Sequence, residues 1–242
     1  AKQPWETLSG ARDNLRKLRA AEKISGPVIV QIQNGTYPLT ETVNFAPEDS
    51  ETHYTAAPRA KPIFEGGQQL TGWKVGQRNG RPEWTLNLPE VVAGNWKFRS
   101  LFVNGRRAPR ARLPKFSPDT KGVNNVFRIG EIKNPEVTHF GAGNDTFKPK
   151  PGDVQAWNSL GDAEAVVLHY WIDERLPRPQ FNSKTGWLRF ARRTGLCLYE
   201  SHEPMFQCKD LARYYIDNLF EALTEPGEWY LNRETGLLHY LP

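Results

Sequence analysis

Cysteine, methionine and histidine are scarce in this chain, and the shortage limits the chemistry that it can hold. The sequence has two cysteines, Cys197 and Cys208, one methionine and five histidines. No Cys-x-x-Cys pair occurs, and the scattered histidines give a zinc site no support, so we expect no metal and no cofactor. A disulfide in an oxidising compartment and two buried thiols both remain open for the cysteines.

Long apolar runs are also missing, because no stretch approaches the roughly 20 apolar residues of a membrane-spanning helix. Membrane insertion is therefore not expected. Charge of one sign does not dominate either, since 32 basic and 27 acidic residues are interspersed, with a formal net charge of +5. This mild excess permits anionic partners in general, yet no RNP, OB-fold or helix-turn-helix pattern accompanies it. Nucleic acid is therefore not an expected partner.

Glycine, proline and tryptophan are abundant instead, with 20, 19 and 8 residues. Glycine and proline punctuate short strands, so this composition is typical of turn-rich β proteins. Hydrophobic residues make up 38% of the 242 residues, which is enough for a packed core and argues against disorder. We therefore expect a mainly β chain that holds one large domain or two modest ones.

Residues 5–24 carry the one strong helix signal. Apolar residues recur there at spacings of three and four: Leu8, Ala11, Leu15 and Leu18. Basic residues fall on the opposite side: Arg12, Arg16 and Lys17. Thr7 or Ser9 is suited to cap the start, and the run Ser25-Gly26-Pro27 predicts the stop.

Very short strand signals, separated by polar turns, follow the helix. Segments near Val30 and Tyr54 lie about one β-solenoid coil apart, and so do the segments near Val43 and Ile63. A helix followed by such strands suits a β-helix whose open end is covered by a helical cap. Residues 1–75 are therefore predicted to form the capping helix and the first coils.

The spacing of the strand signals changes after about residue 73. The sequence Asn104-Gly105 predicts a type I′ turn in a hairpin, because both positions tolerate positive φ. Segments 163–171 and 186–190 are longer strand candidates. We interpret residues 76–212 as an inserted antiparallel β-sandwich.

Residues 213–242 are predicted to return to the β-helix coil. Segments 226–231 and 237–241 give a hairpin signal, in which Gly236 supplies the left-handed turn position. The sequence stops one residue after this strand, and a β-helix that stopped there would expose its lower edge. We therefore expect the native chain to continue beyond Pro242.

Three strings of this sequence resemble one known family. They are GPVIVQIQNGTYPLTETVNFAPEDSETHYTAAPRAKPIFEGGQQLTGW from Gly26, FRSLFVNGRRAPRARLP from Phe98, and NLFEALTEPGEWYLNRETGLLHYLP from Asn218. Together they resemble the N-terminal portion of right-handed parallel β-helix proteins of the glycoside hydrolase family 141 type, with its inserted β-sandwich domain. The string Glu-Pro-Gly-Glu-Trp-Tyr-Leu, with the Thr-Gly-x-Leu-x-Tyr that follows, is the most specific element.

The resemblance implies a secreted or periplasmic protein that acts on a polysaccharide or oligosaccharide. It also implies that the catalytic carboxylates sit on later coils of the β-helix, so no catalytic residue is carried over to this sequence. The chain is therefore expected to be a non-catalytic part of a glycan-degrading protein. One alternative is a glycan-binding module without catalysis, and another is a β-helix protein of the polysaccharide lyase type that acts on acidic glycans.

The basic run that begins at Arg106 is the sharpest charged feature. Arginine forks recognise carboxylates and sulfates bidentately, so Arg106, Arg107 and Arg110 are candidate substrate-binding residues for a uronic-acid or sulfated glycan. The alternative is a hairpin that packs these arginines on neighbouring carboxylates.

Tryptophans provide a second set of candidates, because a flat aromatic face can cover the apolar face of a sugar. Trp96, Trp157 and Trp187 lie near loop or strand ends and are the predicted sugar platforms. Trp171 and Trp229 lie in strongly apolar strings and are predicted to belong to the core.

Carboxylates that could form a hydrolytic pair are poorly arranged. Asp173 and Glu174 are adjacent on a strand and point to opposite faces, whereas glycoside hydrolysis needs two carboxylates roughly 5 to 9.5 Å apart. Glu225 and Glu228 flank a Pro-Gly turn, and Glu228 could instead hydrogen-bond that turn. A purely structural role remains a third hypothesis, with self-association through the exposed end of the β-helix.

Overall fold

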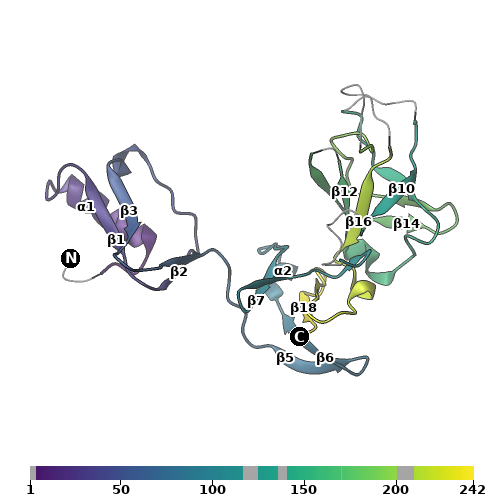
Figure 1. Cartoon of the computed structure of the whole chain (residues 1–242), viewed down its shortest axis with the longest axis horizontal. Helices are drawn as coiled ribbons and strands as arrows, with labels where there is room; N and C mark the ends of the chain where they lie inside the picture. Colours follow the sequence, from purple (N-terminus) through teal and green to yellow (C-terminus); the bar gives the residue numbers. More distant parts are fainter. Residues whose placement is uncertain (1–3, 117–124, 136–140, 170, 201–209) are drawn as a thin grey trace. The chain divides into compact units, whose positions relative to one another are not determined.

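Strands dominate both parts of the chain, and helices are few. The computed structural model describes residues 4–116, 125–135, 141–169, 171–200 and 210–242. The chain divides into two compact units, unit 1 (Ala1–Thr71) and unit 2 (Gly72–Pro242), which are labelled by element in Figure 1. The mainly β class expected from the composition is confirmed.

Unit 1 opens with the predicted helix. The helix α1 spans Leu8–Ala20, and Thr7 caps it, because its Oγ1 accepts a hydrogen bond from the Gly10 amide at 2.9 Å. The helix ends before the predicted stop at Gly26. Glu22 adopts a left-handed φ of 56°, and the Lys23 amide donates to the Leu18 carbonyl, so the last turn closes without a glycine.

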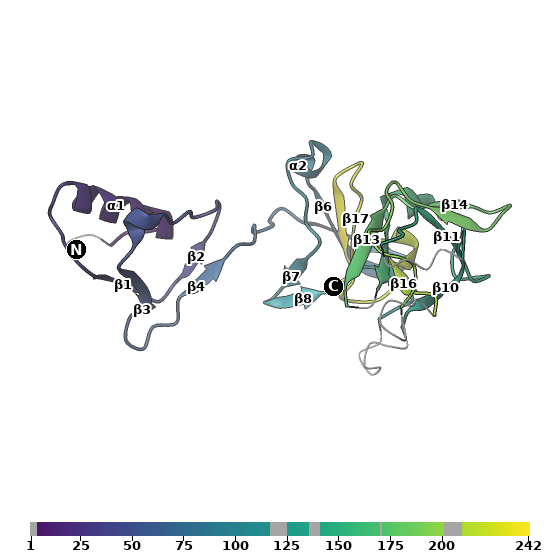
Figure 2. The ribbon, with the colours of Figure 1, turned by 90° about the horizontal axis from the view of Figure 1, so that it is seen from above.

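Two parallel strand pairs follow α1. The strand β1 (Val28–Ile32) pairs with β3 (Thr52–Ala56), and β2 (Thr36–Pro38) pairs with β4 (Ile63–Glu65), as Figure 2 shows. The register places Val30 opposite Tyr54, so the prediction that these two segments lie side by side is confirmed.

The companion prediction, that Val43 lies beside Ile63, is wrong. Ile63 pairs with Thr36, and residues 42–46 form no strand. The backbone and side chains of this segment have other partners, because the Asn44 carbonyl accepts from Arg12 Nη1 at 2.9 Å and the Phe45 ring packs edge-on against Tyr54.

The basic face of α1 is not simply solvated. Arg16 donates to both oxygens of Asp49 in the short helix η1 (Pro47–Asp49), at 2.8 and 2.6 Å. Arg19 Nη1 donates to the Glu48 carbonyl at 2.9 Å. These bonds fix η1 against the helix, which compensates for a small apolar core in which Ala11 and Leu15 are the buried residues of α1.

Unit 2 contains a four-stranded antiparallel sheet in the order β17-β18-β6-β5. Its strands are β5 (Lys74–Arg78), β6 (Arg81–Asn87), β17 (Trp229–Leu231) and β18 (Leu237–Tyr240). The predicted C-terminal hairpin is therefore present as β17 and β18, and Gly236 has the predicted left-handed φ of 71°. A Cβ at Gly236 would lie 2.5 Å from the Leu88 carbonyl oxygen, so this turn packs closely on the start of the short helix α2 (Pro89–Val92).

An eight-stranded sheet forms the larger part of unit 2, in the order β13-β12-β16-β10-β11-β15-β14, with β9 also paired to β16. Every pairing in it is antiparallel. The strands are β9 (Arg112–Leu113), β10 (Phe127–Glu131), β11 (Thr146–Pro149), β12 (Glu164–Leu168), β13 (Asp173–Pro177), β14 (Gln180–Asn182), β15 (Trp187–Arg189) and β16 (Arg213–Asp217). The strands predicted within 163–171 and 186–190 are thus found as β12 and β15.

The core of unit 2 joins the two sheets. Phe147, Leu176, Leu188 and Tyr214 of the large sheet are fully buried and belong to one apolar cluster with Tyr230 of β17. Trp229 is also fully buried, as predicted, whereas Trp171 is 62% exposed and the prediction that it lies in the core is wrong. The strand β12 ends at Leu168, so Trp171 lies in the connection to β13 rather than on a strand face.

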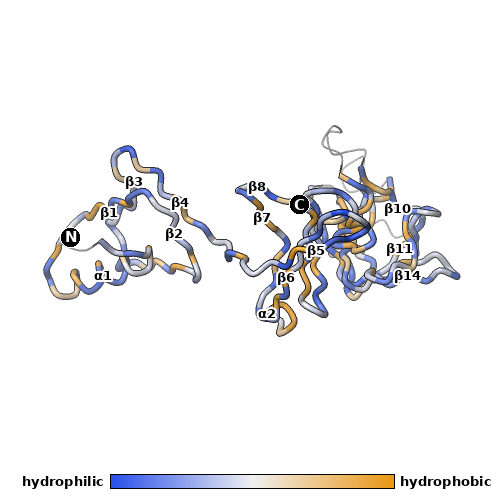
Figure 3. The backbone as a smooth tube through the Cα atoms, turned by 90° about the horizontal axis from the view of Figure 1, so that it is seen from below, coloured by the Kyte–Doolittle hydropathy of each residue, from blue (hydrophilic) through white to orange (hydrophobic). Residues whose placement is uncertain are grey.

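A small hairpin stands beside these sheets. The strands β7 (Leu101–Val103) and β8 (Arg106–Ala108) pair across Asn104 and Gly105, whose φ values are 51° and 74°. Both values are left-handed, so the predicted type I′ turn is confirmed. Figure 3 shows apolar and polar stretches interspersed along the backbone of unit 2.

Candidate functional site

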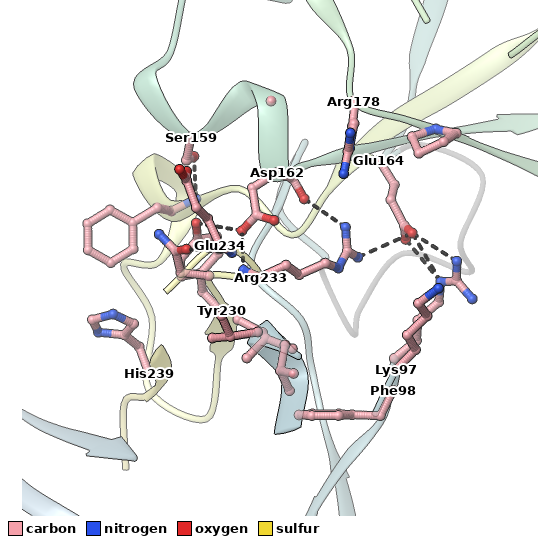
Figure 4. A pocket seen from close by; sticks show the side chains of 18 of the residues that line it. Lys97, Phe98, Ser159, Asp162, Glu164, Arg178, Tyr230, Arg233, Glu234 and His239 are labelled. Carbon is pink, nitrogen blue, oxygen red and sulfur yellow. Dashed lines mark hydrogen bonds and ion pairs between the residues drawn. The ribbon is translucent and has the colours of Figure 1, made fainter. Parts of the chain in front are cut away.

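A large pocket lies in unit 2, where three short helices meet the C-terminal hairpin. Its volume is about 1120 Å³. The walls come from α2 and the segment after it (Val91–Arg99), the short helix η2 (Asn158–Asp162), the short helix η3 (Phe220–Ala222), the turn after β13, and the β17–β18 hairpin. Figure 4 shows the side chains that line it.

Asn218 ties two of these walls together. The residue is fully buried and has a left-handed φ of 57°. Its Nδ2 donates to the Leu231 carbonyl at 2.9 Å and to the Asp162 carbonyl at 3.1 Å, and its Oδ1 accepts from the Leu231 amide at 3.1 Å. One side chain therefore holds the end of η2 against β17, and this fixes the shape of the pocket.

Glu164 lies in the pocket wall at the start of β12 and is surrounded by arginines. Arg99 donates to both of its carboxylate oxygens at 3.0 to 3.2 Å, and Arg110 donates at 3.0 Å. Two more guanidinium groups lie within 3.3 Å of the carboxylate, those of Arg175 and Arg233. The Glu164 side chain itself is only 2% exposed.

A second carboxylate, Asp217, shares two of these arginines. Its Oδ2 accepts from Arg110 Nη1 at 3.0 Å and from Arg175 Nη1 at 2.8 Å. Four guanidinium groups therefore surround two carboxylates, and the cluster carries a surplus of positive charge. The cluster consists of Arg99, Arg110, Glu164, Arg175, Asp217 and Arg233 and is called the arginine cluster.

Ionisation of the cluster follows from this arrangement. Burial opposes the charge on Glu164, but the hydrogen bonds from Arg99 and the charges of Arg110 and Arg233 outweigh it and lower the Glu164 pKa to about 2. Burial and the neighbouring charge of Arg110 lower the pKa of Arg233 below its ordinary value. Glu164 is therefore fixed as a carboxylate at neutral pH.

Asp162 forms a separate link on the pocket wall. Its Oδ2 accepts from the Tyr230 hydroxyl at 2.9 Å and from the Arg233 amide at 3.1 Å. Arg233 Nη1 also donates to the Asp162 carbonyl at 3.0 Å, so Arg233 bridges Asp162 and Glu164 in Figure 4. Burial raises the pKa of Asp162 above its ordinary value, although these hydrogen bonds oppose that effect. Burial likewise raises the pKa of Tyr230.

The remaining pocket carboxylates are Glu221 and Glu234. Glu221 Oε1 accepts from the Ser159 amide at 3.2 Å, and Oε2 accepts from the Ser159 hydroxyl. Glu234 is exposed and its side chain has no partner within the described part of the chain. Three of the four pocket carboxylates are thus engaged in holding the structure.

Trp96 and Phe98 also line the pocket, and their rings pack in a row with that of Trp229. The Trp96 and Phe98 rings lie 4.6 Å apart between centroids, and Phe98 stacks on Trp229 at 5.7 Å. Trp229 is fully buried, and its indole N–H donates to the Ala108 carbonyl at 3.1 Å. Trp96 is half-buried and lines the pocket, so it is the outermost of three packed rings, of which the innermost, Trp229, lies in the core.

The predicted arginines lie in two different environments. Arg106 and Arg107 are exposed on β8 and line no part of the pocket. Arg110 is 8% exposed and belongs to the arginine cluster, with its guanidinium carbon 5.4 Å from the centre of the Trp229 ring. The structure therefore does not bring the three together.

The predicted tryptophans are also separated. Trp96 lines the pocket, whereas Trp157 precedes η2 and packs against the core of unit 2. Trp187 lies on β15, with the Lys133 ammonium 5.4 Å from its ring centre. Of the six predicted site residues, Trp96 is the one that lines the pocket.

Sequence reasoning missed most of the residues that build the site. The spacing of these residues in the sequence does not predict that they come together, because they are far apart: Arg99, Glu164, Arg175 and Arg233. The Arg-Glu-Thr-Gly turn after β17 predicted a hairpin, but it did not indicate that Arg233 belongs to the site. The alternative in which arginines pack on neighbouring carboxylates does describe Arg110.

Two other carboxylates singled out in the sequence serve local structure. Glu228 accepts from the Thr224 and Glu225 amides at 3.0 Å and pairs with Lys115 Nζ at 2.6 Å, so its expected role in the turn is confirmed. Glu174 accepts from the Gly195 amide at 2.9 Å. Cys197 is buried, and Cys208 lies outside the described residues.

Comparisons with known proteins place this arrangement in a structural context. One solved structure, described as "Glycoside hydrolase", matches 100% of this chain with a TM-score of 0.68 and 21% sequence identity. The match covers 40% of that chain, so the present chain spans less than half of its structural neighbour. No protein-family model matches the sequence, and no curated protein matches it. At this level of identity the likeness shows a shared fold.

Neither a membrane span nor a metal site emerges from the described residues. None of their helices is both long and apolar enough to cross a membrane. Across the same ranges, no three His, Cys, Asp or Glu side chains gather into a group that could hold a metal ion.

Proposed function

We propose that this chain is a non-catalytic part of a secreted or periplasmic glycan-degrading protein. The structural likeness to a glycoside hydrolase over the whole chain supports the carbohydrate class. The two parallel strand pairs of unit 1 support the start of a right-handed parallel β-helix, and the antiparallel sheets of unit 2 support an inserted sandwich-like domain. In this proposal, residues 213–242 return the chain to the β-helix.

The state of the pocket carboxylates carries the non-catalytic part of the proposal. A general acid for glycoside hydrolysis needs a raised pKa, close to the working pH. Glu164 has its pKa lowered to about 2, and it is enclosed by arginines and nearly inaccessible. Asp162 has a raised pKa, but its carboxylate is held by Tyr230 and the Arg233 amide rather than presented to a substrate.

The experiment is an incubation of the purified chain with xylans, pectins and fucose-bearing glycans. We expect no release of reducing ends and no unsaturated ends of the kind that a lyase would produce. Asp162→Asn and Glu234→Gln variants serve as matched controls, since each removes one pocket carboxylate that lies outside the arginine cluster. Glycan cleavage that either variant abolishes would contradict the proposal, because it would place catalysis in this pocket.

A structural role in assembly is a second candidate, because unit 1 has unpaired strand edges among its described residues. Its parallel strands also expose apolar side chains, with Ile29 at 66% and Ile63 at 59% exposure. Self-association would raise the sedimentation coefficient as the protein concentration rises. An Ile63→Lys variant should suppress that rise, and concentration-independent sedimentation of the unaltered chain would count against this candidate.

A further inference from the structure

Two cations on the pocket wall have no acidic partner among the residues that the structure describes. Lys97 and Arg178 are exposed and line the pocket, and neither side chain forms a hydrogen bond or ion pair with any described residue. Glu234 is the one acidic residue of the pocket that is likewise exposed and has no side-chain partner among the described residues. The groups that remain available to a ligand therefore carry more positive than negative charge.

The arginine cluster behind this wall adds to the positive potential. Arg99 and Arg233 line the pocket while they share Glu164 with Arg110 and Arg175. Arg110 Nη2 is buried and has no hydrogen-bond partner in the described structure, which indicates that the carboxylates do not saturate the guanidinium donors. A partly enclosed surface with surplus cations concentrates anions.

The backbone at Arg178 is held in an uncommon conformation. Its φ is 52°, in the left-handed region, and prolines precede and follow it in the sequence. The Arg178 amide donates to the Ala163 carbonyl at 3.2 Å, which fixes this turn beside Glu164. Non-glycine residues with such φ values concentrate at ligand sites, where the structure tolerates their cost. This turn presents the Arg178 side chain to the pocket.

The other ligand-facing groups suit a sugar ring. Trp96 offers a half-buried aromatic surface supported by Phe98, and Asn158 and Asn232 place amide groups on the pocket wall. A volume of about 1120 Å³ exceeds what one sugar unit needs, because sites for drug-sized ligands occupy roughly 300 to 1,000 Å³. The pocket therefore has room for a short oligosaccharide.

We propose that this pocket binds an acidic oligosaccharide whose carboxylates pair with Arg178 and Lys97 and of which one sugar ring lies on Trp96. The inference takes its carbohydrate class from the proposed function and its acidic class from the charges in the pocket. It assigns binding, not cleavage, to unit 2. Arg106 and Arg107, which the sequence offered as candidates, do not line the pocket, so the anion-recognising role falls to residues that do.

Isothermal titration of the whole chain with trigalacturonic acid tests this inference, with galactotriose as the neutral comparison. We expect the acidic trisaccharide to bind at least about tenfold more tightly, since a charge-assisted hydrogen bond exceeds a neutral one by that order. The advantage should shrink as salt is raised, because salt screens exposed charges.

Variants locate the binding. Arg178→Gln combined with Lys97→Gln should remove the preference for the acid while leaving the unfolding midpoint unchanged, because both side chains are exposed. Arg106→Gln is the matched control on the exposed hairpin and should bind like the unaltered chain. Glu234→Gln should tighten binding, since it removes a like charge from the same pocket.

Each other outcome has a definite meaning. Equal binding of the two trisaccharides, or no binding of either, would overturn the inference, and the glycan cleavage experiment would still decide the proposed function independently. Loss of binding in Arg106→Gln but not in the double variant would place the site on the hairpin and overturn it as well. Tighter binding of a sulfated trisaccharide than of the galacturonate would refute the carboxylate class.

Discussion

Replacing Glu164 by glutamine is the most informative perturbation of unit 2. The substitution keeps the shape of the side chain and removes the one charge that four guanidinium groups share. Asp217 would then be the remaining carboxylate for Arg110 and Arg175, and Arg99 would lose its ion pair with a carboxylate. We expect unit 2 to be strongly destabilised.

The magnitude can be worked out in two ways. The fall of the Glu164 pKa from 4.5 to about 2 corresponds to about 3 kcal/mol of folding free energy at neutral pH. Removal of one partner from a buried ion pair costs about 3 to 5 kcal/mol in comparable cases. The two figures agree, so we expect Glu164→Gln to lower the free energy of unfolding of unit 2 by about 3 kcal/mol at pH 7.

The pH dependence gives the effect its signature. The folded-state pKa of Glu164 lies below its ordinary value, so its contribution is complete above about pH 4.5 and is lost as pH falls toward about 2. The difference in the free energy of unfolding between the unaltered chain and Glu164→Gln should therefore decrease as the pH is lowered from about 4.5 to about 2. A protonated glutamic acid and a glutamine are both neutral, so the gap should close at the acidic end.

Urea unfolding followed by tryptophan fluorescence reports this change, because all tryptophans except Trp5 lie in unit 2. Glu234→Gln is the matched control, since its side chain is exposed and should change stability by no more than about 0.5 kcal/mol. A Glu164→Gln variant whose free energy of unfolding lies within about 1 kcal/mol of that of the unaltered chain at pH 7, or a difference that does not narrow on acidification, would show that the Glu164 charge does not stabilise unit 2.

Further predictions concern a turn and the first helix. Gly236→Ala should destabilise unit 2 by more than about 1 kcal/mol beyond Gly227→Ala. Both glycines have a left-handed φ, but only at Gly236 would the new Cβ lie 2.5 Å from the Leu88 carbonyl oxygen. Equal urea midpoints of the two variants would contradict this expectation. The hydrogen bond from Arg16 lowers the pKa of Asp49 to about 2, so hydrogen-exchange protection of α1 should fall as pH drops from about 3.8 toward 2. Asp49→Asn should show that lower protection already at neutral pH, and unchanged protection would count against the Arg16–Asp49 bond as the clamp on α1.

Local sequence signals predicted the elements whose cause is local. Asn104-Gly105 and Gly236 require left-handed backbone, and the turns form where these residues stand. Thr7 caps α1 because its hydroxyl reaches an amide three residues on. The pairing of Val30 with Tyr54 was also predictable, since both segments have the composition of short strands and their sequence separation falls in the range of repeat periods.

Features that depend on the register between distant segments could not be predicted in this way. Thr36, rather than Val43, faces Ile63 because the segment around Val43 is occupied by contacts with Arg12 and Tyr54. Trp171 lies in an apolar string but falls beyond the end of β12, so its apolar neighbours did not place it in the core.

The candidate site illustrates the same limit. Arg110 was visible as part of a basic run, but its carboxylate partners lie more than fifty residues away in the sequence. Whether such an arginine binds a ligand or an internal acid is decided by tertiary packing, which a basic run does not encode. Trp96 could be selected because an aromatic residue near a loop end has few core partners to cover it, and the structure places it on the pocket wall.

Nuclear magnetic resonance of trigalacturonic acid incubated with the chain tests binding without cleavage, because one sample reports both. We expect transfer of saturation from the protein to the sugar protons, which Arg178→Gln with Lys97→Gln weakens, while the anomeric signals stay unchanged. New reducing-end or unsaturated-sugar signals that Asp162→Asn or Glu234→Gln abolishes would contradict this expectation, because the pocket would then cleave the glycan that it binds.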